Sequence, residues 1–368
     1  MKTNTPIFTL ISSGPGELTN WVAPICHALK EDHKDAIIDI MLTPCQFASG
    51  LEHIMAKDLP LVRTVSRPKE TFKLGLKGHL GKRHLSKERH IVLFLGGDPF
   101  YANGIGKYLN APVYGYAEKE FKTKFKKLFT RDQIGDLMAS KIAYNLESKD
   151  LTPPTEDPYF LFLAGSRKEH YHNILPIYQK TIRYIKTQDT SFKAILLCSP
   201  FLKGAALDAF KATYDLSQFD SLSQNTEAAM THASGLITIP GTNTAEAAYL
   251  QTPMIVMVAL NKPSVITLKG LAHFISKIPI IGYLLRLLII AVLLLKKPLL
   301  ALPNILLNER FIQERIGYFS GKHLGTIILE FETNPKEKKM IKKKLEAFKP
   351  DKTPAKILIQ KILKLEQL

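Results

Sequence analysis

The sequence predicts an α/β protein with two domains, each built on a parallel sheet. Short apolar runs of the kind found in buried strands alternate with segments whose apolar residues recur at helical spacing. This alternation indicates parallel strands that are covered by helices on both faces. The pattern stops at a proline-rich stretch, residues 151–158, and then starts again. A chain of 368 residues is long enough for two domains of about 100 to 200 residues each.

The first half opens with a strand, a loop and a helix. The four strands that we expect there are residues 7–11, 36–42, 61–65 and 90–95, and the helices are residues 21–29 and 47–55. Ligands of parallel sheets bind where the strands end, so the loops at residues 12–17 and 96–100 are expected to line a site. Two basic runs complete this half: residues 67–89, expected to be a loop, and residues 119–131, with aromatic residues at roughly helical spacing.

The second half repeats this architecture. The strands that we expect are residues 159–163, 194–198, 235–239 and 253–258, with a helix over residues 171–185. The tail from residue 335 onward is rich in lysine, with Ile and Leu at helical spacing, which suits an anionic surface or a groove of another domain.

The most informative stretch is Pro-Gly-Thr-Asn-Thr-Ala-Glu at residues 240–246, between an expected strand and an alanine-rich helix. A helix start offers unpaired N–H groups and partial positive charge, which together bind phosphate. The turn that would hold the phosphate comprises Gly241, Thr242, Asn243 and Thr244. One turn into the helix, Glu246 is placed to accept hydrogen bonds from a ribose diol. The alternative is an ordinary capped helix.

Two more residues lie just past expected strand ends. Arg167 can grip the same diphosphate with two hydrogen bonds and stabilise it as a leaving group. Asp98 follows two glycines, which permit close backbone approach, and can act as a general base. A surface arginine is the alternative for Arg167, and a helix N-cap is the alternative for Asp98.

The first loop, Ser-Gly-Pro-Gly-Glu at residues 13–17, lacks the three-glycine fingerprint of dinucleotide-binding proteins. We therefore expect no nicotinamide cofactor. In this loop Gly14 and Glu17 are the candidates for substrate contact, and a tight turn is the alternative. The three cysteines lie far apart, so neither a disulfide framework nor a zinc site is expected.

Charge and one apolar segment point toward a membrane surface. The formal charge of +17, from 50 Lys and Arg against 33 Asp and Glu, predicts an acidic partner: nucleic acid, an anionic membrane or a phosphorylated substrate. Residues 278–295 are apolar except for Arg286, which would cost ~2.5–3.5 kcal/mol at the centre of a bilayer. Contact with one leaflet is therefore expected rather than spanning, with a buried core helix as the alternative. Residues 1–6 show no leader pattern, which favours the cytoplasm.

Five short motifs occur in an order and spacing that resemble one known family. They are residues 97–100, 134–138, 163–167, 234–253 and 302–306. The last three resemble the Leu-Pro-Gly-Ser-Arg, Ser-Gly-Thr-x-Thr-x-Glu and Leu-Pro-Asn elements of the lipid-A-disaccharide synthase family. The first two are similar to its Asp-bearing loop and its Val-Gly-His-Pro segment. The resemblance covers residues 7 to about 313.

This resemblance implies two Rossmann-like domains facing a cleft, the GT-B type, and an inverting transfer of an acylated glucosamine from UDP to an acylated glucosamine phosphate, without a metal or other cofactor. Asp98 would be the base, Arg167 a diphosphate contact, Glu246 the ribose contact and Asn304 a further substrate contact. The implied partners are a UDP-sugar, an acylated or lipid-linked sugar acceptor, an anionic membrane surface and a second copy in a homodimer, with no nucleic acid. The implied location is cytoplasmic, peripheral to the inner membrane.

The expected organisation is an acceptor domain at residues 1–152, a UDP-sugar domain at 157–331 that includes the apolar segment, and a basic helical tail at 332–368. Departures from the family pattern are a shorter first loop and Asp136 in place of a histidine, both on the acceptor side. Two other interpretations stay open. One is an enzyme like UDP-N-acetylglucosamine 2-epimerase, and the other is a non-catalytic protein that binds a membrane surface or nucleic acid.

Overall fold

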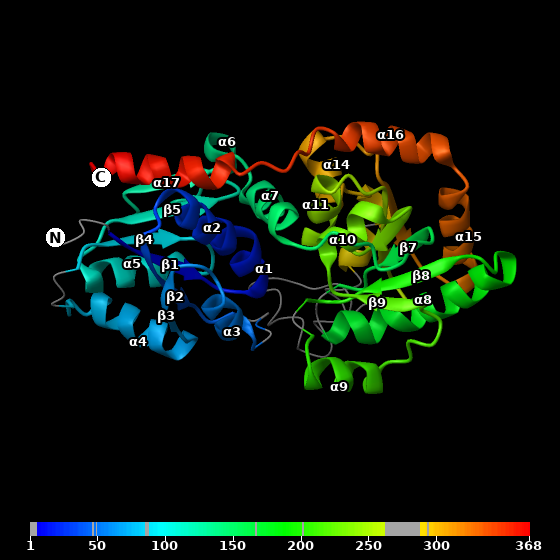
Figure 1. Ribbon diagram of the computed structural model, residues 1–368, viewed down its shortest axis with the longest axis horizontal. Coiled ribbons are helices and arrows are strands. Elements are labelled where there is room, and N and C mark those ends of the chain that lie inside the picture. The colour runs from blue at the N-terminus through cyan, green and yellow to red at the C-terminus, as the bar shows by residue number, and fades with distance from the viewer. Residues whose placement is uncertain are drawn as a thin grey trace. The chain divides into compact units, whose positions relative to one another are not determined.

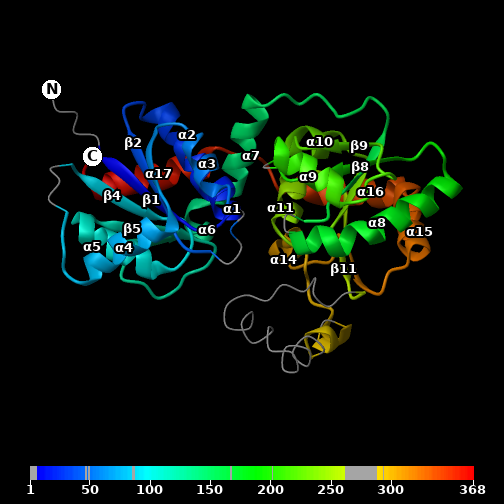
Figure 2. The same cartoon turned by 90° about the horizontal axis from the view of Figure 1, so that it is seen from below.

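The structure is a computed structural model that describes residues 6–45, 48, 50–84, 88–165, 168–200, 202–261, 288–292 and 294–368. It contains two six-stranded sheets, each with helices packed around it (Figure 1; Figure 2). All the strand pairs that the structure describes are parallel. The expected α/β class with two Rossmann-like sheets is therefore confirmed.

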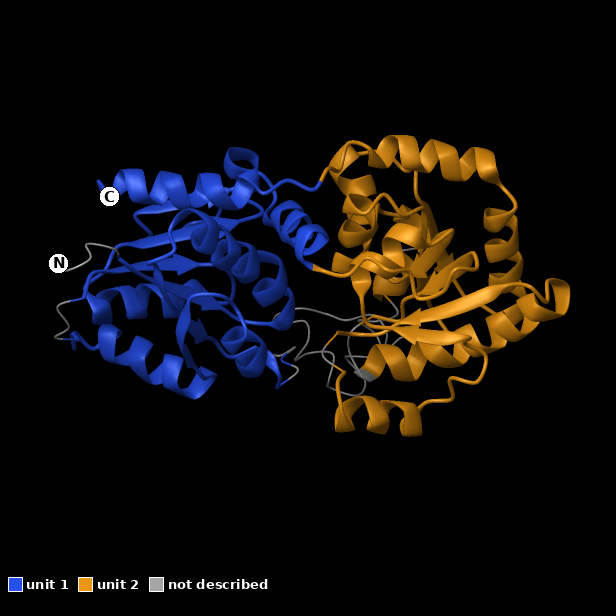
Figure 3. Ribbon diagram, viewed as in Figure 1, with its two compact units in different colours: residues 1–148, 350–368 blue, residues 149–349 orange. Residues whose placement is uncertain are grey.

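The chain divides into two compact units (Figure 3). Unit 1 comprises Met1–Ser148 together with Pro350–Leu368, and unit 2 comprises Lys149–Lys349. The first boundary lies just before the proline-rich stretch at 151–158. The second boundary divides the tail that the sequence suggested as one element, because the last helix belongs to unit 1.

The sheet of unit 1 has the strand order β3-β2-β1-β4-β5-β6. Its strands are β1 (Ile7–Ser12), β2 (Ile37–Leu42), β3 (Val62–Ser66), β4 (His90–Phe94), β5 (Val113–Ala117) and β6 (Lys127–Thr130). Every residue of β1 and β4 is buried. Such continuous burial is typical of central strands covered on both faces, and it places these two strands at the middle of the sheet.

Seven α-helices in the first segment of unit 1, up to Ser148, connect or follow these strands in the described residues. They are α1 (Pro15–Glu17), α2 (Ala23–Asp32), α3 (Glu52–Lys57), α4 (Pro68–His79), α5 (Pro99–Leu109), α6 (Arg131–Ile134) and α7 (Leu137–Ser148), and a π-helical turn, Leu18–Val22, joins α1 to α2. One face of the sheet packs on α2 and α7. The other face packs on α4 and α5 through Val92 and Phe94.

The first basic run, expected to be a loop, forms helix α4 over Pro68–His79, and the described residues that follow, 80–84 and 88–89, are irregular as expected. Pro68 occupies its first turn, and the Glu70 carboxylate accepts a hydrogen bond from the backbone N–H of Arg67 at 2.8 Å, both of which favour a helix start. Glycines lower helix propensity and so obscure the pattern. Here they allow α4 to pack closely on α5, since a Cβ on Gly78 would lie 1.9 Å from the carbonyl oxygen of Gly104.

The second basic run is not a helix, although its aromatic residues recur at roughly helical spacing. Residues up to 126 form an irregular connection, and Lys127–Thr130 forms the edge strand β6. The rings of Phe121 and Phe125 lie 6.1 and 5.3 Å from that of Phe94, in the apolar cluster beneath α5. The path of the irregular connection is therefore consistent with the packing of its two phenylalanine rings onto β4.

Unit 2 repeats the sheet of unit 1, in the order β12-β11-β10-β7-β8-β9. Its strands are β7 (Tyr159–Phe162), β8 (Lys193–Leu197), β9 (Ser221–Ser223), β10 (Gly235–Thr238), β11 (Met254–Ala259) and β12 (Gln313–Gly317). Its helices are α8 (Lys168–Gln188), α9 (Ala205–Thr213), α10 (Thr226–His232), α11 (Thr242–Tyr249), α14 (Leu302–Leu307), α15 (Gly321–Glu332) and α16 (Pro335–Leu345). In both units the first and fourth strands in chain order are central neighbours.

Most of the apolar segment expected at 278–295 lies outside the described residues. Its described end is helical at residues 288–292, and the helical assignment continues at 294–296. Ile290 is buried beside Val258 and Leu260, whereas Leu288 and Leu295 are 61% and 84% exposed. Figure 2 shows this short helix, in gold, projecting from the body of unit 2. Among the residues that are described, no helix combines the length and the apolar character needed to cross a membrane.

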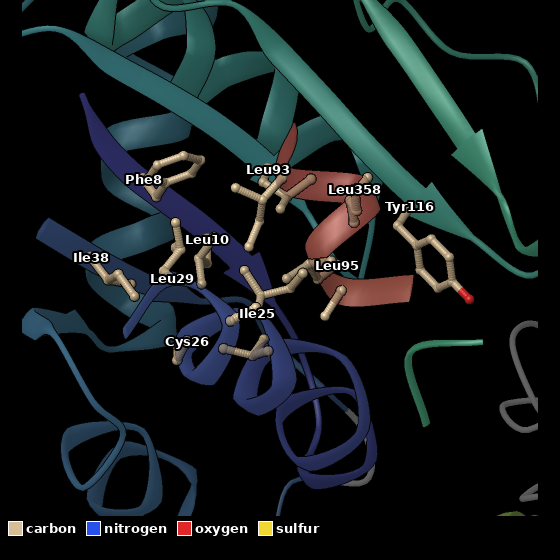
Figure 4. Close-up of a cluster of buried hydrophobic side chains, with 14 of the residues drawn as sticks. Phe8, Leu10, Ile25, Cys26, Leu29, Ile38, Leu93, Leu95, Tyr116 and Leu358 are labelled. Carbon is tan, nitrogen blue, oxygen red and sulfur yellow. The ribbon is translucent and has the colours of Figure 1, made fainter. Parts of the chain in front are cut away.

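The last helix, α17 (Thr353–Leu365), completes the core of unit 1. Leu358, Ile359 and Ile362 are buried with the side chains of β1 and β4, and Leu358 lies close to Leu95 and Tyr116 (Figure 4). Burying a side chain of this kind contributes about 1.5–3 kcal/mol. The helical spacing of the tail is confirmed for α17. Of the two roles expected for the tail, an anionic surface or a groove of another domain, α17 fits the second, because its apolar face packs on the unit that the first half of the chain forms.

Ion pairs fix both ends of α17. At its start, Lys352 pairs with Glu31 at 2.6 Å and with Glu147 at 2.5 Å. Just past its end, Glu366 accepts hydrogen bonds from Tyr114 at 2.5 Å and Lys126 at 2.7 Å. Burial by itself would raise the pKa of Glu366, but these bonds and a third from Arg89 outweigh it and lower the pKa.

Glu366→Gln is expected to destabilise unit 1 by about 1–2 kcal/mol at pH 7, a value that allows for the exposure of Lys126 and Arg89. Because folding lowers the pKa of Glu366, its contribution is complete above the unfolded value of about 4.3 and is lost as the pH falls through the folded value. Urea unfolding should show the same difference between the variant and the unsubstituted protein at pH 7 and pH 5, and a difference that narrows only as the pH falls below about 4. Glu346→Gln, at an exposed glutamate of unit 2, is the control. A pH-independent difference would contradict the assignment.

Candidate functional site

Each sheet has one place where neighbouring strands lead to connections on opposite sides. In unit 1 it lies between β1 and β4, and in unit 2 between β7 and β10. Ligands of open parallel sheets bind at this switch point, outside the carboxyl ends of the strands. The loops that the sequence singled out, at residues 12–17, 96–100 and 240–246, follow β1, β4 and β10 respectively. Each unit therefore has its own candidate half-site, at its own switch point.

In unit 1, two glycines after β4 bring the loops together. Gly96 and Gly97 have φ angles of +138° and +92°, which glycine adopts readily. A Cβ on Gly96 would lie 2.6 Å from Cγ of Glu17, and a Cβ on Gly97 would lie 2.5 Å from Oγ1 of Thr43. The connections after β1, β2 and β4 thus meet at one point.

The first loop folds back on itself at this point. Gly14 is buried at the start of α1, and a Cβ there would lie 3.1 Å from both Oε2 of Glu17 and Sγ of Cys45. The carboxylate of Glu17 therefore lies over the loop, while the side chain also contacts the Gly96 position. Gly14, Glu17 and the glycine pair that precedes Asp98 therefore lie close together. The interpretation of these residues as parts of one half-site requires this proximity.

Asp98 is exposed and forms the N-cap of α5. Its Oδ1 accepts a hydrogen bond from the backbone N–H of Phe100 at 2.8 Å, and Oδ2 receives no hydrogen bond from the described part of the chain. Burial, and after it the negative charge of Asp98, raises the pKa of the neighbouring Tyr101. The two interpretations of Asp98 are compatible, because one oxygen caps the helix and orients the other toward solvent.

Two residues near this half-site were missed by the sequence analysis. Thr43 is buried directly after β2, and its hydroxyl donates a hydrogen bond to the Ser12 carbonyl at 3.2 Å. A polar residue at the end of an apolar strand was the available signal. Asn20 lies in the π-helical turn, a feature often found at functional sites, and its buried Oδ1 has no hydrogen-bond partner among the described residues. Nothing in the sequence marks that turn.

In unit 2, the corresponding half is the start of α11. Gly241 occupies the N-cap with φ +154°, and no side chain in the described residues caps this helix. Thr242 is exposed and Asn243 half-buried, so the first two residues of the helix lie at an accessible surface. An uncapped helix start at a switch point is suited to binding an anion.

The loop after β7 lies against this region. Gly165 has a φ of +95°, and a Cβ there would lie 2.8 Å from the side chain of Ile239 and 2.5 Å from the ring of His170. Strand β7 continues its pairing here, since the N–H of Leu163 donates to Ile237 at 2.9 Å. Arg167, the expected diphosphate contact, lies outside the described residues.

The remaining predicted residues of unit 2 differ in their accessibility. Glu246 is half-buried in the second turn of α11. Thr244 is buried, and its hydroxyl bonds to the carbonyl of Gly241 and to the N–H of Leu302. Asn304 is fully buried, and protein groups take both of its N–H donors and both acceptor positions of its oxygen. This engagement favours a structural role for Asn304 over direct substrate contact.

The chain matches the model of a known protein family. The model of the lipid-A-disaccharide synthetase family matches residues 118–356, more than half of the chain. This range includes the whole of unit 2 and the last helices of the first half. No match was found among curated proteins.

Two solved structures resemble the chain over almost its entire length. One is S. aureus MnaA in complex with UDP, with a TM-score of 0.57 and 11% identity over 99% of this chain and 98% of that one. The other is a putative UDP-N-acetylglucosamine 2-epimerase from Listeria monocytogenes, with a TM-score of 0.54 and 11% identity over the same shares. At this identity the likeness shows the fold alone, and the GT-B class expected from the sequence is confirmed.

Two effects make Gly97 hard to replace: its close contact with Thr43 and its positive φ. Gly81, which has a positive φ but no close contact, allows the energetic cost of each effect to be measured. Gly97→Ala and Gly81→Ala both place alanine at positive φ, at a cost of about 1–2 kcal/mol, but a Cβ on Gly81 meets no atom within 4 Å. The free energy of unfolding, measured in urea, should therefore fall further for Gly97→Ala, by at least about 1 kcal/mol more. Equal losses for the two variants would contradict the close contact between Gly97 and the buried Thr43.

Proposed function

The chain belongs to the lipid-A-disaccharide synthetase family, and on this premise we propose that it is an inverting glycosyltransferase. The proposed reaction moves an N-acetylglucosamine-type sugar, acylated or not, from UDP to an acylated or lipid-linked sugar. The observation that carries the proposal is the uncapped start of α11 at the switch point of unit 2, where a diphosphate would bind. Family membership supports glycosyl transfer as the chemistry.

The donor half is assigned to unit 2. The backbone N–H groups of Thr242 and Asn243 would bind the diphosphate, with Arg167 as a further contact proposed from its sequence position. The partial positive charge of the helix start stabilises the charge that develops on the departing UDP. Glu246, one turn further along α11, would accept hydrogen bonds from the ribose hydroxyls.

The acceptor half is assigned to unit 1. In the proposed step, an acceptor hydroxyl oxygen attacks C1 of the sugar from the face opposite UDP. The new C1–O bond forms as the bond to the diphosphate oxygen breaks, and UDP leaves with the bonding electrons. Oδ2 of Asp98 takes the proton of the acceptor hydroxyl. Gly14 and Glu17, which lie beside the glycine pair, would contact the acceptor.

Asp98→Asn is expected to lower turnover by about 10²–10⁴-fold while UDP affinity stays unchanged. Asparagine caps helices as well as aspartate does, so the start of α5 should persist. Glu246→Ala is the contrasting variant and should weaken UDP binding. Transfer is measured by mass spectrometry of lipid extracts incubated with UDP-sugars, and UDP affinity by calorimetry.

Full turnover by Asp98→Asn would exclude Asp98 as the base. Conversion of UDP-N-acetylglucosamine to an epimer without any lipid would instead favour the epimerase interpretation. Binding of a short RNA with a steep salt dependence, in the absence of UDP binding, would favour the non-catalytic one. Sedimentation of the same preparation tests the homodimer that the family resemblance suggests.

We further propose that the enzyme is peripheral to an anionic membrane. One face of α4 exposes three lysines and three apolar side chains at helical spacing: Lys69, Phe72, Lys73, Leu76, Lys77 and Leu80. None of these lysines has an ion-pair partner among the described residues. Mixed basic and apolar faces of this kind lie at the headgroup boundary of anionic membranes. The exposed apolar residues of 288–296 in unit 2 support the same conclusion.

Reversing two charges on this face should weaken membrane binding. Lys73→Glu with Lys77→Glu is expected to lower binding to vesicles containing phosphatidylglycerol by at least about tenfold, since each basic residue near such a surface contributes ~1 kcal/mol. The matched control is Lys339→Glu with Lys343→Glu, an exposed lysine pair of the same spacing on α16. Vesicle co-sedimentation gives the readout. An equal loss in the control would indicate that net charge, not the α4 face, governs binding.

A further inference from the structure

We propose that Thr244, Asn304 and Glu314 are positioning residues, which hold the phosphate-binding turn of unit 2 in shape from behind. The inference rests on the proposed function, because it concerns the turn that would bind the UDP diphosphate. In this proposal, Asn304 of the Leu-Pro-Asn motif supports the turn and does not contact the substrate.

Thr244 is the link between the turn and the rest of the unit. Its side chain is buried, and its hydroxyl donates to the carbonyl oxygen of Gly241 at 2.8 Å. Oγ1 of Thr244 also accepts a hydrogen bond from the N–H of Leu302, the first residue of α14, at 3.0 Å. The hydroxyl therefore joins the start of α11 to the start of α14.

The bond to Gly241 determines where the first free N–H group points. In a trans peptide the C=O of Gly241 and the N–H of Thr242 point in opposite directions. Both the hydroxyl and the backbone N–H of Thr244 bond to that carbonyl and hold it toward the helix. The N–H of Thr242 is thereby directed outward. Thr244 therefore helps to fix the plane of the Gly241–Thr242 peptide from the side of the helix, and its side chain does not cover the N–H groups that an anion needs.

Glu314 and Asn304 hold α14 in turn. The Glu314 side chain is fully buried, and its Oε1 accepts hydrogen bonds from the N–H groups of Leu300 and Ala301, both at 2.7 Å. The Asn304 amide donates to the same oxygen at 2.9 Å. The buried negative charge of Glu314 is paired with Arg310 at 2.5 Å, which offsets the cost of its desolvation.

These contacts form one continuous connection. Glu314 fixes the residues just before α14, the N–H of Leu302 meets Thr244, and Thr244 sets the Gly241 peptide. Asn304 locks the same helix to the backbone of Phe311 and Ile312, just before β12. Strands β10 and β12 both belong to the sheet of unit 2. The turn follows β10 directly and is linked to β12 through α14, so two strands of the sheet hold it in place. Pre-organisation of this kind preserves the geometry of a binding site.

The test compares two buried threonines of unit 2. Thr244→Val removes the hydroxyl with little change in shape and is expected to weaken UDP binding about tenfold, the equivalent of ~1.4 kcal/mol. Thr244→Ser keeps the hydroxyl and should restore the affinity to within about threefold. Thr252→Val removes a similarly buried hydroxyl, which donates to Met230 at 2.7 Å, and should leave UDP affinity unchanged. Calorimetry with UDP is done well below the unfolding temperature of each variant.

Glu314→Gln tests the far end of the connection. It removes the charge on a residue that does not touch the turn, and UDP binding should weaken severalfold in protein that still unfolds cooperatively. Unchanged affinity in Thr244→Val, or equal losses in Thr244→Val and Thr252→Val, would overturn the positioning role while leaving the proposed function intact. Absence of UDP binding by the unsubstituted protein would overturn both.

Discussion

The parallel pairing of the strands is the constraint on which the candidate site depends. In a parallel sheet all carboxyl ends lie at one edge, and where the chain turns from one side of the sheet to the other, neighbouring loops diverge and leave room for a ligand. Both units have the same order, with β1 beside β4 and β7 beside β10. Gly96 and Gly97 follow β4, Gly165 follows β7 and Gly241 follows β10, all with positive φ. Close packing of loops at these edges follows from the topology, and the chemistry of each half follows from which side chains the loops carry.

Much of this architecture could be predicted from the sequence, because strands buried on both faces are continuous apolar runs. Strands β1, β4, β7 and β10 were all recognisable in this way. The elements that were missed depend on contacts far along the chain. Helix α4 needs glycines that fit against α5, and β6 needs a neighbouring strand and aromatic packing on Phe94. Local periodicity cannot report either requirement, because it reflects only residues that are close together in the chain.

The candidate site, like the fold, has features that the sequence predicts and features that it does not. A strand end followed by glycine and a small polar residue marks the turn at Gly241 and the loop before Asp98, and both lie at switch points. Which polar atoms are already occupied is a three-dimensional property. Thr242 and Thr244 look equivalent in the sequence, yet one is exposed and the other has its hydroxyl bonded on both sides. Asn304 stands in a motif, but its amide is saturated within the fold. A motif in the sequence can therefore combine candidates for ligand contact with residues whose side chains hold the backbone in place.

The return of α17 to unit 1 has a consequence for how the protein is made. Translation produces α17 after all of unit 2, which is one uninterrupted segment, Lys149–Lys349. Unit 2 can therefore finish folding on the ribosome while unit 1, although synthesised first, still lacks the helix that covers Leu95 and Tyr116. Unit 1 therefore departs from the usual order, in which a domain can complete its core as soon as its first segment is made. Until α17 is made, the part of the apolar face that it covers, which includes Leu95 and Tyr116, stays open to chaperones. Premature termination anywhere before α17 leaves that part uncovered.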